Sequence, residues 1–194
     1  MENTSVIVLA AGASKRLGQP KQLLLVDGIP MIIHVIRKII DAGFHQIMVV
    51  LGHDHAPIEQ MIKELPVHHF VHQNWTEGMG SSLSAGLSEA LKIWPQTNFL
   101  LISVCDQPNI PTQHFKRIRN ELEIGKNEII ASGYQQTFGP PIACNRKHFH
   151  ELTLLKGDQG AKSIFKKYLD EMKIIHCEEG GLDIDTPVDV LKID

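Results

Sequence analysis

The chain lacks the features that mark secreted, membrane-spanning and nucleic-acid-binding proteins. It has 3 cysteines in 194 residues and no C-x-x-C pair, so we expect no disulfide framework and a cytoplasmic location. No apolar run approaches the roughly 20 residues of a membrane span, and no basic flank precedes the first apolar run as in a signal peptide. The net charge of −3 argues against a nucleic-acid partner bound through bulk charge.

Two glycine-rich phosphate-binding motifs are also missing. The chain contains neither G-x-x-x-x-G-K-[ST] nor G-x-G-x-x-G, the loops that hold phosphates in two large groups of nucleotide-binding proteins. Its 43% hydrophobic and 21% charged residues are typical of a globular protein. Because it has no internal repeat, low-complexity stretch or linker, and its length suits one domain, we predict a single domain over residues 1–194.

Apolar strand-like runs alternate along the chain with segments of helical periodicity. The predicted strands are residues 6–10, 46–51, 68–71, 99–104, 128–131 and 173–176. The predicted helices are residues 30–42, 56–65, 81–94, 112–123, 160–169 and 187–193. This alternation is typical of an α/β fold, and we predict a three-layer α/β/α sandwich with a Rossmann-like, mostly parallel sheet. Ligands of such sheets bind at the carboxyl ends of the strands.

A candidate anion-binding loop follows the first predicted strand. Its residues of interest are Leu9, Ala10, Ala11, Gly12, Arg16 and Lys21. Small residues let backbone N–H groups approach an anion closely, and Arg16 and Lys21 add positive charge where a polyphosphate would lie. A tight basic connection between a strand and a helix would explain the same residues, so the loop alone leaves both interpretations open.

Asp106 follows the predicted strand 99–104 and should lie at the same sheet edge as this loop. Magnesium favours one or two carboxylates together with substrate phosphates and water, and Asp106 is therefore a candidate metal ligand. The alternative is a turn residue before Pro108. The neighbouring thiol of Cys105 has no assignable histidine partner, and we predict that it is structural rather than nucleophilic.

A second acidic site lies near the end of the sequence. Alternation along an extended segment places Asp183 and Asp185 on the same side, so either could complete a metal site with Asp106. Asp185 or Thr186 could instead cap a helix that begins at Pro187.

Three loops rich in glycine or proline are further candidates. Residues 77–86 open a predicted helix, where N–H groups and hydroxyls suit a phosphate, a ribose or a base edge, and Gly80 and Ser82 are its candidate binding residues. Alternatively, Ser81 or Ser82 only caps that helix. Residues 138–142 are predicted to form a stiff turn facing a ligand, and residues 156–162 a polar entry to a helix, with a plain surface loop as the alternative for either.

Taken together, five of these segments resemble the nucleotidyltransferases that act on the molybdenum cofactor, within the larger glycosyltransferase-A-like family. The segments are residues 9–21, 77–83, 106–108, 157–162 and 183–187, in that order. The resemblance implies that residues 9–12, Arg16 and Lys21 wrap a nucleoside triphosphate, and that Ser82, beside Gly80, contacts the nucleoside. It also implies that Asp106 binds Mg²⁺ together with Asp183 or Asp185.

The implied reaction is attack of an acceptor phosphate on the α-phosphorus of the triphosphate, with release of pyrophosphate. Arg16, Lys21 and Asp106 would be its catalytic residues. The Ala-Ala-Gly form of residues 10–12 resembles the cytidylyl-transferring branch, which favours CTP over GTP, and the implied acceptor is the molybdopterin or molybdenum cofactor. That branch often has Gly-His-Pro where this chain has Gly139-Pro140-Pro141, which leaves the acceptor contacts open.

Two other functions remain compatible with the sequence. The acceptor could be a sugar phosphate or another small phosphate. The protein could instead be a non-catalytic factor that binds the molybdenum cofactor and delivers it to a hydroxylase such as xanthine dehydrogenase. A site for both triphosphate and metal favours the enzyme, because a carrier has no need of it.

Overall fold

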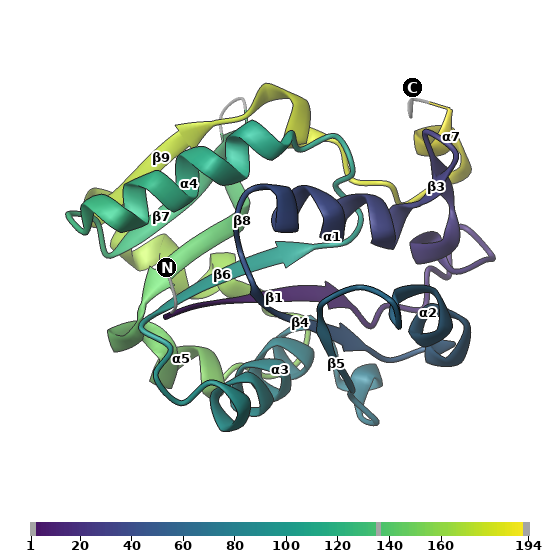
Figure 1. Ribbon diagram of the computed structural model, residues 1–194, viewed down its shortest axis with the longest axis horizontal. Helices are drawn as coiled ribbons and strands as arrows, with labels where there is room; N and C mark the ends of the chain where they lie inside the picture. The colour runs from purple at the N-terminus through teal and green to yellow at the C-terminus, as the bar shows by residue number, and fades with distance from the viewer. Residues whose placement is uncertain (1–2, 135–136, 192–194) are drawn as a thin grey trace.

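A mixed sheet of 7 strands forms the centre of the molecule in the order β5-β4-β1-β6-β8-β7-β9 (Figure 1). The computed structural model describes residues 3–134 and 137–191. The strands of the sheet are β1 (Thr4–Ala10), β4 (Gln46–Leu51), β5 (His68–Val71), β6 (Phe99–Val104), β7 (Ile129–Tyr134), β8 (Thr137–Asn145) and β9 (Met172–His176). Only β8 runs antiparallel to its neighbours in this sheet. A hairpin of β2 (Leu25–Val26) and β3 (Ile29–Pro30) lies apart from it.

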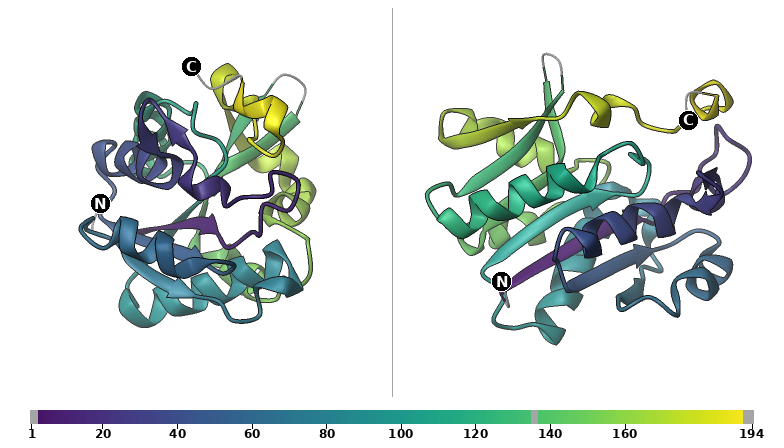
Figure 2. Two further views of the ribbon diagram at one scale, coloured as in Figure 1. Left: turned by 90° about the vertical axis from the view of Figure 1, so that its right-hand side faces the viewer. Right: turned by 45° about the horizontal axis from the view of Figure 1, so that its top comes forward.

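Helices cover both faces of the sheet (Figure 2). They are α1 (Met31–Asp41), α2 (His55–Ile62), α3 (Met79–Ile93), α4 (Thr112–Ile124), α5 (Phe149–Thr153), α6 (Ala161–Phe165) and α7 (Pro187–Val190). Short 3₁₀ turns are η1 (Lys21–Leu23), η2 (Trp75–Glu77), η3 (Arg146–His148), η4 (Lys166–Glu171) and η5 (Glu178–Gly181). The predicted three-layer α/β/α sandwich is confirmed.

Alternation along β1 explains the two layers of the core. Val6 and Val8 pack in a cluster with buried residues of α1, α2 and α4, whereas Ile7 and Leu9 pack with those of α3, α5 and α6. Every residue of β1 is buried, which is expected of a central strand covered by helices on both faces. The first strand is therefore a rigid base for the loop that follows it.

The strand order creates the crevice in which parallel α/β sheets bind their ligands. After β1 the chain crosses to β4 and β5 on one side, and it then returns to add β6 on the other side of β1. The strand order thus reverses between β1 and β6, and ligands of such sheets bind outside the carboxyl ends of the strands at this point. The candidate loop and Asp106 both lie there.

The prediction of a turn over residues 138–142 is wrong, because these residues belong to β8. Pro140 and Pro141 have no N–H to donate to the sheet, and the pairing with β7 skips from Ile142 to Gly139 at this point. The hydroxyl of Ser132 donates to the carbonyl oxygen of Pro141 at 2.9 Å. The two prolines therefore interrupt the pairing with β7 without ending strand β8.

Three predicted helix boundaries also need correction. The helix predicted over residues 160–169 ends as an α-helix at Phe165 and continues as the 3₁₀ turn η4, in which Tyr168 leaves helical geometry. Helix α3 begins at Met79 with Gly78 as its N-cap, so neither Ser81 nor Ser82 caps it. Helix α7 spans Pro187–Val190, and residues 192–193 of the predicted helix lie outside the described residues.

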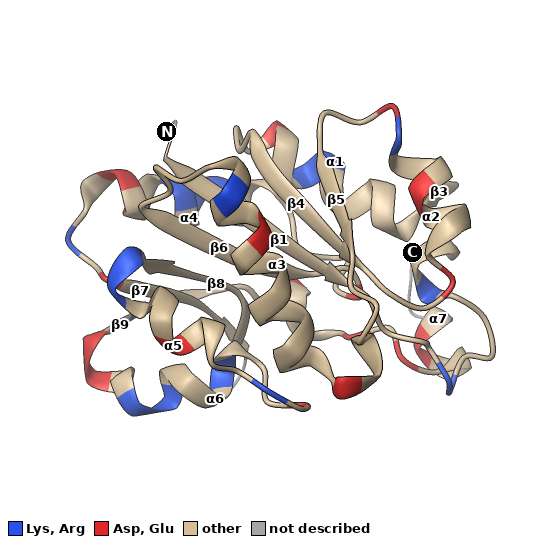
Figure 3. Cartoon of the chain, turned by 90° about the horizontal axis from the view of Figure 1, so that it is seen from below, with Lys and Arg blue, Asp and Glu red and all other residues tan. Residues whose placement is uncertain are grey.

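No helix within residues 3–134 and 137–191 is long and apolar enough to span a lipid bilayer. Acidic and basic segments alternate along the ribbon in Figure 3 instead of gathering on one side.

Candidate active site

The loop after β1 is folded back on itself by its own polar groups. The buried side chain of Gln22 donates through Nε2 to the carbonyl oxygens of Ala10 at 2.7 Å and Gly12 at 3.1 Å. Ser14 has a φ of 51°, and its Oγ accepts from the backbone N–H of Lys21 at 3.1 Å. A Cβ atom added at Gly12 would meet nothing within 4 Å, so this part of the loop is open to a ligand.

Lys21 joins this loop to two acidic segments of the chain. Its Nζ lies 2.5 Å from Oδ2 of Asp106 and 2.9 Å from Oδ1 of Asp185. The Lys21 side chain is only 12% exposed. Burial disfavours its charged form, yet the Asp106 and Asp185 carboxylates outweigh that effect and raise the pKa of Lys21. The ammonium group is therefore firmly protonated.

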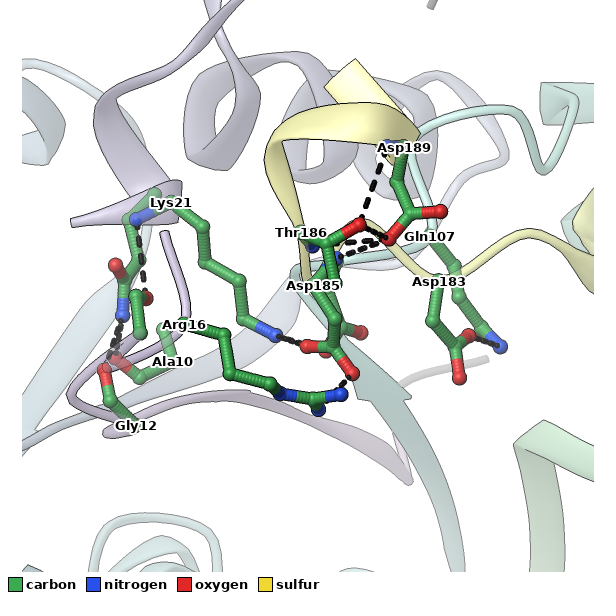
Figure 4. Close-up of polar contacts among 12 residues, drawn as sticks. Ala10, Gly12, Arg16, Lys21, Gln107, Asp183, Asp185, Thr186 and Asp189 are labelled. Atoms are coloured by element: carbon green, nitrogen blue, oxygen red, sulfur yellow. Dashed lines mark hydrogen bonds and ion pairs between the residues drawn. The ribbon is translucent and has the colours of Figure 1, made fainter. Parts of the chain in front are cut away.

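Arg16 approaches the same acidic segment from the solvent side. Its guanidinium group contacts Oδ2 of Asp185 at 2.7 Å, with the Arg16 side chain 69% exposed. Burial alone would raise the pKa of Asp185, but Lys21 and Arg16 outweigh it and lower that pKa. Figure 4 shows both cationic side chains pointing to this one carboxylate.

Asp183 takes a different partner from Asp185. Its Oδ1 accepts a hydrogen bond from Nε2 of Gln107 at 2.9 Å, on the far side of the acidic segment from Lys21 in Figure 4. Residues 182–185 lie outside any strand, so the two aspartates differ in their hydrogen-bond partners. Asp183 nevertheless stays near the others, and burial and the charges of Asp106 and Asp185 raise its pKa.

Backbone contacts fix the acidic segment against the end of β6. The N–H of Ile184, which is fully buried, donates to the carbonyl oxygen of Asp106 at 2.9 Å. Thr186 is the N-cap of α7 and forms a capping box with Asp189, as Figure 4 shows. The capping role predicted for Thr186 is thus confirmed, and it leaves the Asp185 carboxylate free to face Lys21.

Asp106 and Asp185 form a donor set that suits a hard divalent cation. Their oxygens converge on a single nitrogen atom of Lys21, so both are within reach of one cation. Among the residues that the structure describes, no group of three or more His, Cys, Asp or Glu could hold a metal ion. A cation here would need further oxygen ligands from phosphate or water, which is the usual arrangement for Mg²⁺ bound with a nucleotide.

A cleft of about 360 Å³ lies between the loop after β1, the end of β6 and the start of α3. This volume is typical of small-molecule sites. Of the residues predicted from the sequence, the cleft is lined by Leu9, Ala10, Ala11, Gly12, Lys21, Ser82 and Asp106. Arg16, Gly80, Asp183 and Asp185 are not part of this lining. Arg16 and Asp185 still reach the site through Lys21 and its partners.

Gly80 has a packing role at the start of α3. Its N–H donates to the carbonyl oxygen of Gly157 at 2.8 Å, and a Cβ at this position would lie 2.6 Å from the carbonyl oxygen of Gln159. This N–H is therefore already used within the protein. Ser82, two residues further, is 4% exposed and donates through Oγ to the carbonyl oxygen of Gly78 at 3.2 Å.

Four cleft or loop residues escaped the sequence analysis. Trp75, Thr76 and Asp158 line the cleft, and Gln22 shapes the loop. Gln22 lies one residue after Lys21, and Trp75 and Thr76 directly precede the glycine-serine loop, so closeness to a motif was the available signal. Asp158 lies within the segment 157–162 that carries part of the family resemblance, but nothing in that segment singled out its carboxylate.

The Cys105 thiol is buried, in keeping with the structural role predicted for it. The Cys105 side chain is 2% exposed, and burial raises the pKa of its thiol to about 12, so the thiol is a poor nucleophile at neutral pH. No histidine lines the cleft in the described part of the chain.

The chain is similar to several known proteins. A family model described as "MobA-like NTP transferase domain" matches residues 6–172. The nicotine blue oxidoreductase of Paenarthrobacter nicotinovorans is 28% identical over 192 residues, covering 93% of this chain and 91% of that protein. The purine catabolism protein PucB of Bacillus subtilis (strain 168) is 26% identical over 193 residues, with coverage of 93% and 91%. A probable molybdenum cofactor guanylyltransferase of Bacillus cytotoxicus is 29% identical over 182 residues, with coverage of 91% and 82%.

Solved structures have the same architecture. Rv0371c from Mycobacterium tuberculosis H37Rv superimposes with a TM-score of 0.85 at 26% identity, covering 98% of this chain and 96% of that one. Its complex with manganese gives a TM-score of 0.81 at 24% identity, with coverage of 98% and 97%. The sheet and its helices have the α/β fold of nucleotidyltransferases. The chain belongs to the MobA-like NTP transferase domain family, and is thereby related to proteins of molybdenum cofactor biosynthesis.

Proposed function

We propose that this protein transfers a nucleotidyl group from a nucleoside triphosphate to a phosphate-bearing acceptor. The observation that carries the proposal is the Lys21 ammonium group, held by Asp106 and Asp185 beside an open small-residue loop. An acceptor phosphate oxygen forms a new bond to the α-phosphorus, the bond from that phosphorus to its β-bridging oxygen breaks, and pyrophosphate leaves with the electron pair. One NTP-transferase domain would carry the whole reaction.

The residues of this chain act mainly by positioning groups and neutralising charge, as in other phosphoryl-type transfers. Backbone N–H groups of residues 9–12 would bind phosphate oxygens, and Lys21 and Arg16 would balance the charge on the β- and γ-phosphates. An acceptor phosphate is already an anionic nucleophile, so the reaction needs no general base. The absence of histidine from the cleft lining in the described residues is in keeping with this.

Asp106 and Asp185 are the proposed ligands of a divalent cation, and Mg²⁺ is the ion we propose. A cation bound there would supply charge neutralisation at the triphosphate oxygens. The manganese complex of a protein with the same fold supports a divalent ion in general. Asp183 would stay with Gln107 outside this ligand pair.

For the substrates, we propose CTP and the molybdenum cofactor or its molybdopterin precursor. Ala11, which lines the cleft, supports CTP, and the guanylyltransferase among the relatives supports the acceptor and makes GTP the rival nucleotide. The relative named for purine catabolism supports a molybdenum hydroxylase such as xanthine dehydrogenase as the client. The free thiols of all three cysteines support a cytoplasmic location.

The test is to mix the purified protein with Mg²⁺, each of the common nucleoside triphosphates, and molybdenum cofactor or a sugar phosphate. Pyrophosphate release and mass analysis of the product are then measured. We expect release only with the cofactor, and fastest with CTP. Tight cofactor binding without pyrophosphate release from any triphosphate would refute the enzyme and favour the carrier.

A further inference from the structure

Asp158 places a separate carboxylate in the cleft. It lines the cleft together with Trp75, Thr76 and Met79 and is exposed. Unlike Asp106, which pairs with Lys21, it has no ion pair or side-chain hydrogen bond within residues 3–134 and 137–191. A carboxylate without a cation is unexpected in a cleft that is proposed to bind a polyanion.

Close packing fixes the place of this carboxylate beside the first turn of α3. Gly78 has a φ of +108°, and a Cβ atom there would lie 2.4 Å from the carbonyl carbon of Gly157 and 2.5 Å from Oδ1 of Asp158. The N–H of Gly80 donates to the carbonyl oxygen of Gly157 at 2.8 Å. The segments 78–80 and 157–159 thus touch backbone to backbone, which only glycine at position 78 permits.

The chemistry of Asp158 limits what part of a nucleotide it can face. An ionised carboxylate accepts hydrogen bonds and donates none, and it repels phosphate groups of the same charge. The partner must therefore be an N–H or O–H group of the nucleoside. The neighbouring Met79 side chain, which is 47% exposed, and the indole of Trp75 offer apolar surface of the kind that a planar base covers.

We propose that Asp158 reads the base of the nucleotide by accepting a hydrogen bond from its exocyclic amino group. This inference rests on the proposed nucleotidyl transfer and adds the determinant of base choice. Uracil presents a carbonyl oxygen where cytosine has the amino group, so two acceptors would face each other and the hydrogen bond to Asp158 would be lost. A site built in this way rejects the wrong base more strongly than an apolar site can.

The test measures the dissociation constants of CTP, UTP, GTP and ITP with Mg²⁺ by calorimetry. CTP and UTP differ by an amino group replaced with a carbonyl, and GTP and ITP by an amino group removed. We expect the wild type to bind the amino-bearing member of its preferred pair at least about tenfold more tightly. Asp158→Asn should reduce that ratio several-fold, mainly because the asparagine amide can also donate a hydrogen bond to the carbonyl oxygen of the disfavoured base, as in uracil.

Asp170→Asn is the matched control, because Asp170 is exposed and lies outside the cleft lining. It should keep the wild-type ratio, and thermal melts should show that both variants are folded. Equal weakening of all four nucleotides by Asp158→Asn, with an unchanged ratio, would assign Asp158 to the ribose and overturn the inference. A wild type that binds no triphosphate would instead overturn the proposed function, and this inference with it.

Discussion

Gln107 and Asp183 form a hydrogen bond that links the two segments carrying the proposed metal ligands. Nε2 of Gln107 lies 2.9 Å from Oδ1 of Asp183, and each residue is a near neighbour in sequence of a carboxylate bound to Lys21. The Gln107 side chain is 7% exposed. This bond holds the end of β6 and the acidic segment in a fixed relation.

Exchanging the amide and the carboxylate tests this link. Gln107→Glu should lower the free energy of unfolding by roughly 1–3 kcal/mol, because it buries a second acceptor against Asp183. Adding Asp183→Asn restores a donor and an acceptor, so the double variant should recover about 1 kcal/mol in a denaturant titration. Additive effects of the two substitutions would show that the bond carries no coupling.

Asp106 and Asp185 should differ from Asp183 in their effect on catalysis. Asp106→Ala and Asp185→Asn should each reduce the rate of transfer by roughly a hundredfold or more, because each removes a proposed ligand of the cation that neutralises the triphosphate. Asp183→Asn should keep most of the activity, since an amide oxygen can still accept from Gln107. Initial rates over a series of Mg²⁺ concentrations check this, and near-normal turnover of Asp106→Ala would exclude its metal role.

Loss of the Lys21 side chain should weaken nucleotide binding more than it lowers the stability of the fold. We expect Lys21→Ala to weaken the binding of CTP with Mg²⁺ by about tenfold or more, the usual loss for a charge-assisted hydrogen bond. Its melting temperature should fall only slightly, because the Asp106 and Asp185 side chains are 20% and 36% exposed and can be hydrated. Lys126→Ala, at an exposed position, is the control, and equal CTP affinity in Lys21→Ala and wild type would contradict the phosphate role.

Gly12→Ala should affect nucleotide binding and not the stability of the fold. A methyl group there meets no protein atom within 4 Å, so Gly12→Ala should leave the melting temperature within a few degrees of the wild type. It should nevertheless weaken triphosphate binding, because the methyl group takes space at the loop where an anion approaches the backbone. Gly78→Ala is the contrasting variant and should be clearly destabilised, since its φ is +108° and its Cβ would clash. Unchanged nucleotide affinity of Gly12→Ala would argue against a ligand at this loop.

His114 should make the protein less stable in mild acid. Its side chain is 2% exposed, its Nε2 lies 2.7 Å from the hydroxyl of Ser132, and Ser132 itself donates to Pro141, so His114 is the donor of that bond. Its Nδ1 is buried without a partner among the described residues. Burial, with a smaller effect of Arg117, lowers the pKa of His114 from 6.5 to about 4.

Because the pKa is lower in the folded state, the neutral histidine contributes stability that is complete above pH 6.5 and is lost as the pH falls towards about 4. The loss should amount to roughly 2–3 kcal/mol. His114→Gln can keep the donor to Ser132 without titrating. The difference in unfolding free energy between wild type and this variant should therefore change over that pH range, and a constant difference would contradict the assignment.

The sequence predicted the elements whose burial leaves a periodic pattern. The run 6–10 was recognisable as a strand because all of its residues are buried between two helical layers. Helix α1 was recognisable because its buried apolar residues recur at helical spacing. β8 was missed because Pro140 and Pro141 resemble a turn, and only the pairing with β7 shows that the strand continues past them.

The sequence identified charged residues of the candidate site but not the partner that each of them contacts. Residues 9–12, Lys21 and Asp106 meet at one cleft as expected from strand order. Alternation could not separate Asp183 from Asp185, because their segment is not a strand. The segment 157–162 was recognised from the sequence, but the place of Asp158 in the cleft was not, since it depends on the backbone contact between residues 78–80 and 157–159.

The two hydrogen bonds of Gln22 determine when the loop after β1 loses its conformational freedom. They tie down the carbonyl groups of Ala10 and Gly12 from within the protein, so the loop is ordered as the chain folds and not when a ligand arrives. The entropy of ordering these residues is then part of the folding equilibrium, and binding is spared that cost. Affinity at this site therefore depends on a glutamine whose side chain is 1% exposed.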